Sequence, residues 1–399
     1  MNSIVAKTRN NFAYVSPTAI NFGVGVSAGT AEQAKSLGIS KAMVVTDTFL
    51  SETQGGKAVI EGLRNAGCNP IVWPGVVPDP TDTSIHEGAE VYLKAECDSL
   101  IAIGGGSHMD TAKCIGVLVM NGNKISDYYT CIENPNPAPI TRVPPLICLP
   151  TTAGTGAEVT NAAVVSATSD NRKFGVVHPL IAPRMALVDP GLTLTLPPLQ
   201  TAATGLDALA HAVEGYISIL ENPITDALAL YSLELISNNL RRAVYSGADM
   251  EARINMSLAA LLAGLVIGTC YATSGHAVGQ AIGGRFHILH GLSVSLPLPA
   301  ALEYNRPACQ EKLSKIAFVM GAAKEGMSQR EAADAAIEEI VQLIKDVNVP
   351  TLAESATMSD EDIDMVACAA AADGCSFLNP RPWSAQTYVG LLKKTLGTA

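Results

Sequence analysis

Four of the seven histidines lie between residues 211 and 290, in an Ala- and Leu-rich part of the chain. One of them, His211, follows Asp207 by four residues. On a helix this spacing places both side chains on one face, with Cβ atoms about 5–6 Å apart. Such a pair can chelate a divalent cation, or its two members can simply hydrogen-bond to each other. The spacing of this pair alone leaves both interpretations open.

His276 and His290 extend the pattern if the chain turns back between them. On one straight helix, 14 residues would separate them by about 21 Å, so we predict a break at Gly283–Gly284. His276 also lies in a stretch, 255–284, without Asp, Glu, Lys or Arg. An unpaired imidazole is costly to bury there, and a metal would remove that cost. One carboxylate and three imidazoles suit Fe(II) or Zn(II), whereas Mg(II) and Ca(II) prefer oxygen ligands.

A second group of chemically suggestive residues follows the strand-like runs of the N-terminal half. Three glycines, 104–106, come directly after the run IAI and precede a helical pattern. Glycines let the backbone approach a phosphate, and a helix N-terminus offers free N–H groups. The GxGxxG fingerprint is not met, because Met109 occupies its third glycine position. A tight strand-to-helix turn without a ligand is the alternative.

Two further loops have the same setting. Asp47 ends the run AMVVTD, where a carboxylate could accept hydrogen bonds from both ribose hydroxyls of NAD and would repel the extra phosphate of NADP. It could equally cap the following helix. TTAGTGAE, 151–158, is a third loop of small and hydroxyl-bearing residues. Three such loops after three strands predict a nucleotide cofactor.

The elements that must position these residues divide the chain near Pro197–Pro198. Before this boundary, strand-like runs at 41–47, 69–75, 98–106, 145–152 and 184–189 alternate with helical patterns at 30–38, 54–66, 82–96 and 108–121. This alternation predicts an α/β domain, 1–197, with a parallel dinucleotide-binding sheet. Runs at 161–168 and 173–178 predict a hairpin. After the boundary near Pro197–Pro198, helical spacing predicts an all-α metal-binding and substrate domain, 198–399. Its predicted helices include 225–244, 329–347 and 360–372.

Composition excludes several classes of protein. The 399 residues are 48% hydrophobic and 16% charged, with a formal net charge of −11. An acidic protein is a poor ligand for nucleic-acid phosphates. Nine scattered cysteines without a CxxC pair favour reduced thiols in the cytoplasm. The N-terminus lacks a signal-peptide core, and the longest apolar run, LAALLAGLVIG, is too short to span a membrane. We expect a cytoplasmic protein without a nucleic-acid or membrane partner.

Four segments together resemble the iron-containing alcohol dehydrogenase family. They are GGGSxxDxAK at 104–113, TTAGTGAE at 151–158, GLDALAHAVEGY at 206–216 and SGHAVGQAIGGRFHILHG at 274–291, with VVTD before Thr48 and PDPT at 78–81 matching as well. The resemblance covers essentially the whole chain. It implies a metal bound by Asp207, His211, His276 and His290. It also implies an NAD site lined by Asp47, Asp79, Gly105, Gly106, Ser107, His108, Met109, Asp110, Thr151, Thr152, Thr155 and Lys173.

The implied activity is that of a metal-dependent, NAD-linked alcohol dehydrogenase or aldehyde reductase for short-chain substrates. The metal would polarise the substrate oxygen, and hydride would pass between the carbinol carbon and nicotinamide. A homodimer or larger homo-oligomer is implied as well. A lyase resembling dehydroquinate synthase would need several Lys or Arg residues around a phosphate, which 255–284 does not supply. A non-catalytic metal- or NAD-binding protein is the other alternative.

The sequence departs from the family pattern near the last ligands. Gln280 stands where many relatives carry a histidine, and glutamine cannot exchange a proton near neutral pH. Relatives usually carry two aromatics and a proline before the last ligand, whereas this segment reads Arg285, Phe286, His287, Ile288, Leu289. Gln280, Arg285 and His287 are therefore candidate substrate contacts. Arg285 could bind a carboxylate or sulfonate, which predicts a reductase for a short anionic aldehyde such as sulfoacetaldehyde or succinic semialdehyde. Alternatively, Arg285 pairs with a nearby acid or points to solvent.

Overall fold

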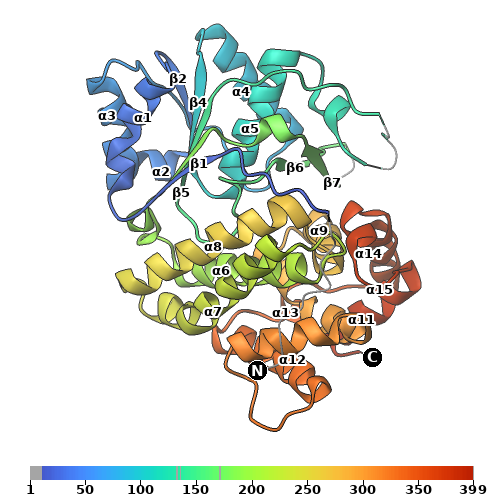
Figure 1. Ribbon diagram of the computed structural model, residues 1–399. Helices are drawn as coiled ribbons and strands as arrows, with labels where there is room; N and C mark the ends of the chain where they lie inside the picture. Colours follow the sequence, from blue (N-terminus) through green and yellow to red (C-terminus); the bar gives the residue numbers. More distant parts are fainter. Residues whose placement is uncertain (1–10, 132–133, 135, 170–171, 399) are drawn as a thin grey trace. The chain divides into compact units, whose positions relative to one another are not determined.

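A parallel sheet of six strands forms the centre of the N-terminal unit. We describe a computed structural model, in which residues 11–131, 134, 136–169 and 172–398 are described. The strand order is β1-β8-β5-β4-β2-β3, and every pair is parallel (Figure 1). The strands are β1 Ala19–Phe22, β2 Ala42–Val45, β3 Ile71–Trp73, β4 Ser99–Gly104, β5 Leu146–Pro150 and β8 Met185–Val188. The predicted α/β fold with a parallel sheet is confirmed.

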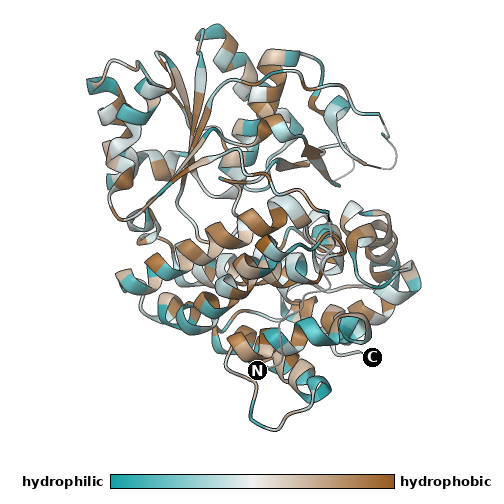
Figure 2. Ribbon diagram, viewed as in Figure 1, coloured by the Kyte–Doolittle hydropathy of each residue, from teal (hydrophilic) through white to brown (hydrophobic). Residues whose placement is uncertain are grey.

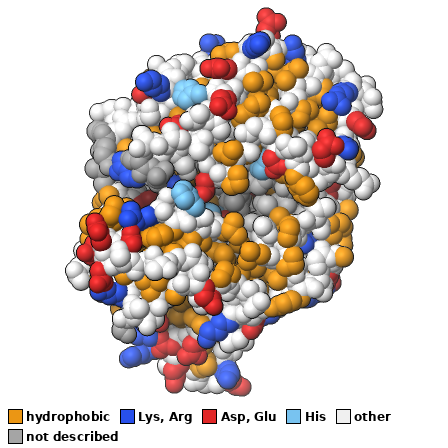
Figure 3. Space-filling model, turned by 180° about the vertical axis from the view of Figure 1, so that it is seen from behind, with side chains coloured by type: hydrophobic (Ala, Val, Ile, Leu, Met, Phe, Trp, Pro, Cys, Tyr) orange, Lys and Arg blue, Asp and Glu red, His pale blue; other side chains and the backbone are white. Residues whose placement is uncertain are grey.

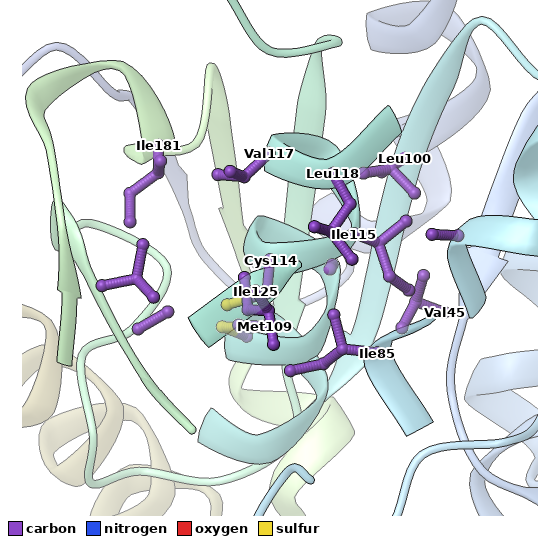
Figure 4. Close-up of a cluster of buried hydrophobic side chains, with 14 of the residues drawn as sticks. Val45, Ile85, Leu100, Met109, Cys114, Ile115, Val117, Leu118, Ile125 and Ile181 are labelled. Atoms are coloured by element: carbon purple, nitrogen blue, oxygen red, sulfur yellow. The ribbon is translucent and has the colours of Figure 1, made fainter. Parts of the chain in front are cut away.

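Helices cover both faces of this sheet. The predicted helices of the α/β half correspond to α1 Thr30–Ser36, α3 Gln54–Asn65, α4 Asp82–Lys94 and α5 Gly106–Asn121, and the short α2 Thr48–Glu52 follows β2. On β2, Val44 packs in a core with residues of α1 and α3, whereas Met43 and Val45 pack with residues of α4 and α5. Successive residues of a strand point to opposite faces. The apolar runs are therefore buried on both sides, and Figure 4 shows the α4–α5 side.

Two strands lie outside the sheet, and one strand of the sheet escaped prediction. The predicted hairpin is confirmed, since β6 Ala162–Ser166 pairs antiparallel with β7 Lys173–Val177. The unpredicted strand is β1, which pairs with β8 at the edge of the sheet formed by the described residues and is exposed or half-buried along its length. Such a short edge strand carries no continuous apolar run. Its only signal is pairing with residues more than 160 positions away.

Helices make up the C-terminal part of the chain. Pro223 and the Asn222 cap begin α7, and boxes at Ser328 and Ser359 cap α12 and α14. The helices are α6 Pro198–Ile217, α7 Pro223–Tyr245, α8 Met250–Cys270, α9 Ser274–Phe286, α10 His290–Ser295, α11 Leu298–Val319, α12 Gln329–Asp346, α13 Leu352–Ser355, α14 Asp360–Ala372 and α15 Ala385–Leu396. Short 3-10 turns occur at Val26–Gly29, Ile125–Tyr128, Pro179–Ile181, Pro190–Thr193 and Gly374–Leu378.

The chain forms two compact units. One contains 17–197 and 247–257, and the other contains the described parts of 1–16, 198–246 and 258–399. The start of α8 thus belongs to the α/β unit, whereas the predicted helical domain contains all residues from 198 onward. Arg253 explains this difference, because its buried guanidinium donates hydrogen bonds to the carbonyls of Gly247 and Leu196.

α8 is the most apolar long helix of the chain. By length and composition alone it could cross a membrane, but 56% of its most apolar window is buried inside the protein. Figure 2 shows apolar residues along the strands and along several helices. On the face in Figure 3, acidic and basic side chains are interspersed, and the described residues there form no continuous basic patch.

Candidate metal centre and dinucleotide site

The i,i+4 pair of the sequence lies on α6. Asp207 and His211 are almost completely buried, with exposed fractions of 1% and 4%. His211 Nε2 lies 3.5 Å from Asp207 Oδ1. The helical spacing therefore places both side chains on one face, as predicted.

α9 and α10 bring the other two histidines to the same carboxylate. His276 Nε2 and His290 Nε2 each lie 3.7 Å from Asp207 Oδ1. The ligand atoms of Asp207, His276 and His290 all lie within 4.8 Å of one another. The imidazole of His290 remains 32% exposed, so the cluster is open on this side.

The chain turns between these histidines at His287. The predicted break at Gly283–Gly284 is wrong, since α9 continues through both glycines to Phe286. Both glycines are buried, and helix packing compensates for their low helix propensity. His287 has a left-handed conformation, φ 54°, and its N–H donates to the carbonyl of Gly283. This capping turn allows α10 to begin at His290.

Gly291 lets α10 approach α6 closely. A Cβ atom at this position would lie 1.9 Å from the carbonyl oxygen of Ala203 and 3.2 Å from Asp207 Cβ. No side chain fits such a gap. The glycine after the last histidine therefore has a packing role that fixes the distance between His290 and Asp207.

The geometry of the cluster suits a metal ion better than direct hydrogen bonds. Separations of 3.5–3.7 Å between Nε2 atoms and Asp207 Oδ1 are too long for strong hydrogen bonds. A tetrahedral ion with bonds of about 2.1 Å would separate its ligands by about 3.4 Å. Among the described residues, Asp207 Oδ1 and His276 Nε2 are buried without a hydrogen-bond partner. Burial would raise the pKa of Asp207, but the surrounding histidines hold it well below its usual range.

Glu214, one helical turn beyond His211, is a functional residue that sequence reasoning missed. It is 1% exposed, and its Oε2 contacts His276 Nδ1. Its Oε1 accepts hydrogen bonds from Thr273, Gly275 and His276. Burial would lower the pKa of His276, but the carboxylates of Glu214 and Asp207 raise it to about 10. A carboxylate on the far nitrogen of a metal-ligating histidine fixes its tautomer and orientation.

In the α/β unit, the glycine turn and the threonine loop pack against each other. β4 and β5 are neighbours, so the loops after them meet at one edge of the sheet. A Cβ atom on Gly105 would lie 3.1 Å from Thr152, and one on Gly106 would lie 2.7 Å from Thr155. Gly105 is the N-cap of α5, and no side chain caps this helix end. An uncapped helix N-terminus favours an anion.

Asp47 has the capping role that the sequence offered as an alternative to ribose binding. Its Oδ1 accepts a hydrogen bond of 2.7 Å from the N–H of Leu50 and so caps α2. Its Oδ2 lies 2.9 Å from His108 Nε2, and the side chain remains 31% exposed. β2 neighbours β4, which places this carboxylate at the same edge as the glycine turn.

Other predicted cofactor residues have structural partners. The side chain of Met109 is 1% exposed and lies in the core of Figure 4, so only its backbone can face a ligand. Asp110 Oδ2 accepts a hydrogen bond from the N–H of Val164 on β6. Lys173 Nζ lies 2.5 Å from Asp79 Oδ1, so these two residues neutralise each other.

The candidate substrate residues lie on and just after α9. Arg285 pairs with Asp362 through two guanidinium nitrogens, and Asp362 also caps α14. The alternative that Arg285 pairs with a nearby acid is therefore the one seen. His287 is exposed. Gln280 lies on α9, four residues after His276, and its Nε2 is 3.8 Å from Cys375 Sγ.

Comparison with known proteins assigns the chain to one family. A family model described as iron-containing alcohol dehydrogenase matches 17–190, and its C-terminal counterpart matches 201–396. The chain belongs to the iron-containing alcohol dehydrogenase family. It is therefore an oxidoreductase, which rules out the lyase and the non-catalytic binding protein as main interpretations.

Relatives within the iron-containing alcohol dehydrogenase family match nearly the whole chain. "Choline dehydrogenase" of Bacillus subtilis is 38% identical, with 99% of this chain and 97% of that protein covered. "NAD-dependent methanol dehydrogenase" of Bacillus methanolicus is 35% identical, with 95% and 98% covered. A crystal structure of 1,3-propanediol oxidoreductase is 34% identical and has a TM-score of 0.92, with 96% of this chain and 100% of that chain covered.

Proposed function

We propose that this protein is an NAD-linked, metal-dependent alcohol dehydrogenase and aldehyde reductase for short-chain substrates. The observation that carries the proposal is the cluster of Asp207, His276 and His290 in the helical unit, with His211 Nε2 3.5 Å from the same carboxylate oxygen. The partly exposed edge at His290 leaves room for a small substrate.

Asp207, His211, His276 and His290 would hold one divalent ion, with Fe(II) the first choice and Zn(II) the alternative. When bound, such an ion withdraws electron density from a substrate oxygen and so activates a carbonyl towards hydride. Glu214 orients His276 for this task. In the alcohol-oxidising direction, the carbinol C–H bond breaks as hydride passes to NAD, and the hydroxyl proton is released. Gln280 can orient a substrate hydroxyl, but its amide cannot carry that proton.

The cofactor would bind at the strand ends of the α/β unit. Asp47 would accept the ribose hydroxyls, and the amides at the start of α5 would receive the diphosphate. A short neutral alcohol is favoured over an anionic aldehyde, because Asp362 already neutralises Arg285. The names of relatives that act on methanol and choline point to small alcohols as well.

A substrate panel tests the proposal. Protein loaded with Fe(II) or with Zn(II) is assayed by NADH absorbance with methanol, 1,3-propanediol, choline, short neutral aldehydes and succinic semialdehyde. We expect turnover of neutral short-chain substrates with NAD, and loss of both turnover and bound metal in His290→Ala. His178→Ala is the control, because the imidazole of this half-buried histidine of the α/β unit only accepts a hydrogen bond from the N–H of Leu180. Absence of turnover with every substrate and either metal would refute the proposed function.

The preference for NAD over NADP is tested at Asp47. A carboxylate beside the ribose favours two hydroxyls and repels a phosphate. Asp47→Asn should therefore raise NADP use relative to NAD by about tenfold, the effect of about 1.4 kcal/mol. An unchanged ratio of kcat/KM for the two cofactors would remove Asp47 from the ribose site.

We further propose that the protein works in the cytoplasm as a homodimer or larger homo-oligomer. All nine cysteines are free thiols in the structure, which fits a reducing compartment. Light scattering on the purified protein measures the oligomeric state, and a monomeric mass would contradict the second part.

A further inference from the structure

His108 is a titratable residue at the start of α5 that packs directly over the glycine turn. Gly104 has a φ of 154°, and a Cβ atom on it would lie 2.1 Å from His108 Cγ. The imidazole therefore occupies the space that the missing side chain leaves. Only 12% of its surface is exposed.

The imidazole contacts the carboxylate that is proposed to read the ribose. His108 Nε2 lies 2.9 Å from Asp47 Oδ2, while Oδ1 of the same carboxylate accepts the N–H of Leu50. A carboxylate only accepts hydrogen bonds, so Nε2 carries the proton and His108 Nδ1 is the bare nitrogen in the neutral ring. Both oxygens of Asp47 are thus fixed in place, and its exposed part faces solvent.

The charge of this pair depends on the protonation of His108. Burial lowers the pKa of His108 more than the contact with Asp47 raises it, so the ring is neutral at pH 7 and gains its proton only as the pH falls. The other acids of α2 and α5 are each paired with a lysine. Asp110 on α5 lies 3.6 Å from Lys113, and Glu52 on α2 lies 2.9 Å from Lys57. The strands β2 and β4 carry no charged residue.

We propose that His108 is a specificity-determining residue that makes the preference for NAD over NADP depend on pH. The inference rests on the proposed function, in which Asp47 binds the adenosine ribose. With a neutral ring, the pair carries one negative charge and repels a 2′-phosphate. With a protonated ring, the pair is neutral overall, so a 2′-phosphate meets much less repulsion.

Calorimetric binding of NAD and NADP to the metal-loaded protein tests this inference between about pH 5 and pH 8, the range in which histidines titrate. The 2′-phosphate itself has a pKa of about 6 and also favours NADP binding at low pH. His108→Gln is therefore the matched control, because its amide can replace Nε2 but does not titrate. We expect the ratio of the NADP and NAD dissociation constants to fall about five- to tenfold further in the wild type than in H108Q.

Equal pH dependence in the wild type and H108Q would overturn the inference, because phosphate titration would then account for the whole effect. His108→Asn repeats the comparison with a shorter amide if H108Q does not fold, as judged by circular dichroism. Asp47→Asn distinguishes failure of the inference about His108 from failure of the proposed ribose site at Asp47. If D47N leaves the ratio of dissociation constants unchanged at about pH 8, Asp47 is not at the ribose, and the proposed function fails at that point.

Discussion

At the scale of single residues, Glu214 is the most informative side chain outside the metal ligands. It is buried, accepts hydrogen bonds from the start of α9 and contacts the far nitrogen of His276. Gly275 makes this possible, because a Cβ atom there would lie 3.0 Å from the carboxylate. The carboxylate thus links the folding of α9 to the orientation of one ligand.

Glu214→Gln should weaken metal binding by about 10- to 100-fold, the usual effect of removing such an outer partner. The amide keeps the size of the side chain but loses the charge that holds His276 in one tautomer. Competition with a chromophoric chelator measures the metal affinity independently of activity. Glu303→Gln is the control, since Glu303 is a partly exposed residue that pairs with Lys394 elsewhere in the helical unit. Equal metal affinity in E214Q and the wild type would show that the contact is only structural.

At the scale of elements, the metal centre depends on the approach of α10 to α6. Gly291→Ala should push α10 away, because the new Cβ atom would meet the carbonyl of Ala203 at 1.9 Å. We expect loss of bound metal with the helices otherwise retained, measured by metal analysis and circular dichroism. Gly390→Ala on α15 is the matched control, because its Cβ atom would meet nothing within 4 Å. That variant should bind metal normally and gain up to about 1 kcal/mol of stability. Full metal content in G291A would contradict this packing role.

A buried acid in the loop after β5 gives the α/β unit a pH-dependent stability. Glu158 is 3% exposed, and burial raises its pKa to about 7, although its own backbone and Lys113 oppose the shift. The folded state therefore binds the proton more tightly than the unfolded state does. Stability is fully present below the unfolded pKa and falls as the pH rises through about 7.

Glu158→Gln should remove this decline, because the amide carries no charge to desolvate. We expect the variant to be more stable than the wild type at about pH 8, by up to about 3 kcal/mol at roughly 1.4 kcal/mol per pKa unit. Chemical unfolding at a series of pH values measures the difference. Glu61→Gln, at an exposed position of α3, should leave the profile unchanged. Parallel profiles of E158Q and the wild type would refute the assignment.

At the scale of the whole molecule, the two compact units carry different ligands. The metal ligands and Glu214 all lie in the helical unit, whereas Asp47, the glycine turn and the threonine loop all lie in the α/β unit. Each unit has its own buried residues. Metal binding should therefore stabilise the helical unit directly.

Removing the metal with a chelator should increase hydrogen exchange in α6, α9 and α10 and leave β4 and β5 unchanged. The reason is that the ion would connect three helices whose histidines otherwise surround a single carboxylate. Exchange followed by mass spectrometry resolves these segments. Addition of NAD alone is the converse experiment, in which β4 and β5 should respond and α6, α9 and α10 should not. Equal effects on both sets of segments would show that the two units do not respond separately.

The sequence by itself determined the features that depend on local periodicity. Alternating β-branched and helical runs predicted five of the strands in the parallel sheet, because strand and helix periods are readable over short windows. The Asp207 and His211 pair was predictable for the same reason. Glycines after β4 were predictable as a strand-to-helix turn, and in the structure they pack against Thr152 and Thr155, while their approach to a ligand stays a prediction.

Only the tertiary structure decided the features that depend on distant contacts. β1 exists because it pairs with β8, and Arg285 faces Asp362, 77 residues away, rather than a substrate. The chain turns at His287 instead of Gly283–Gly284, because helix packing offset the low propensity of the glycines. In the sequence, Glu214 has no feature that separates it from other acids on helices. Its role depends on contacts with Gly275 and His276 at the start of α9. Burial and long-range partners set the roles of these residues, and neither can be read from neighbouring positions in the chain.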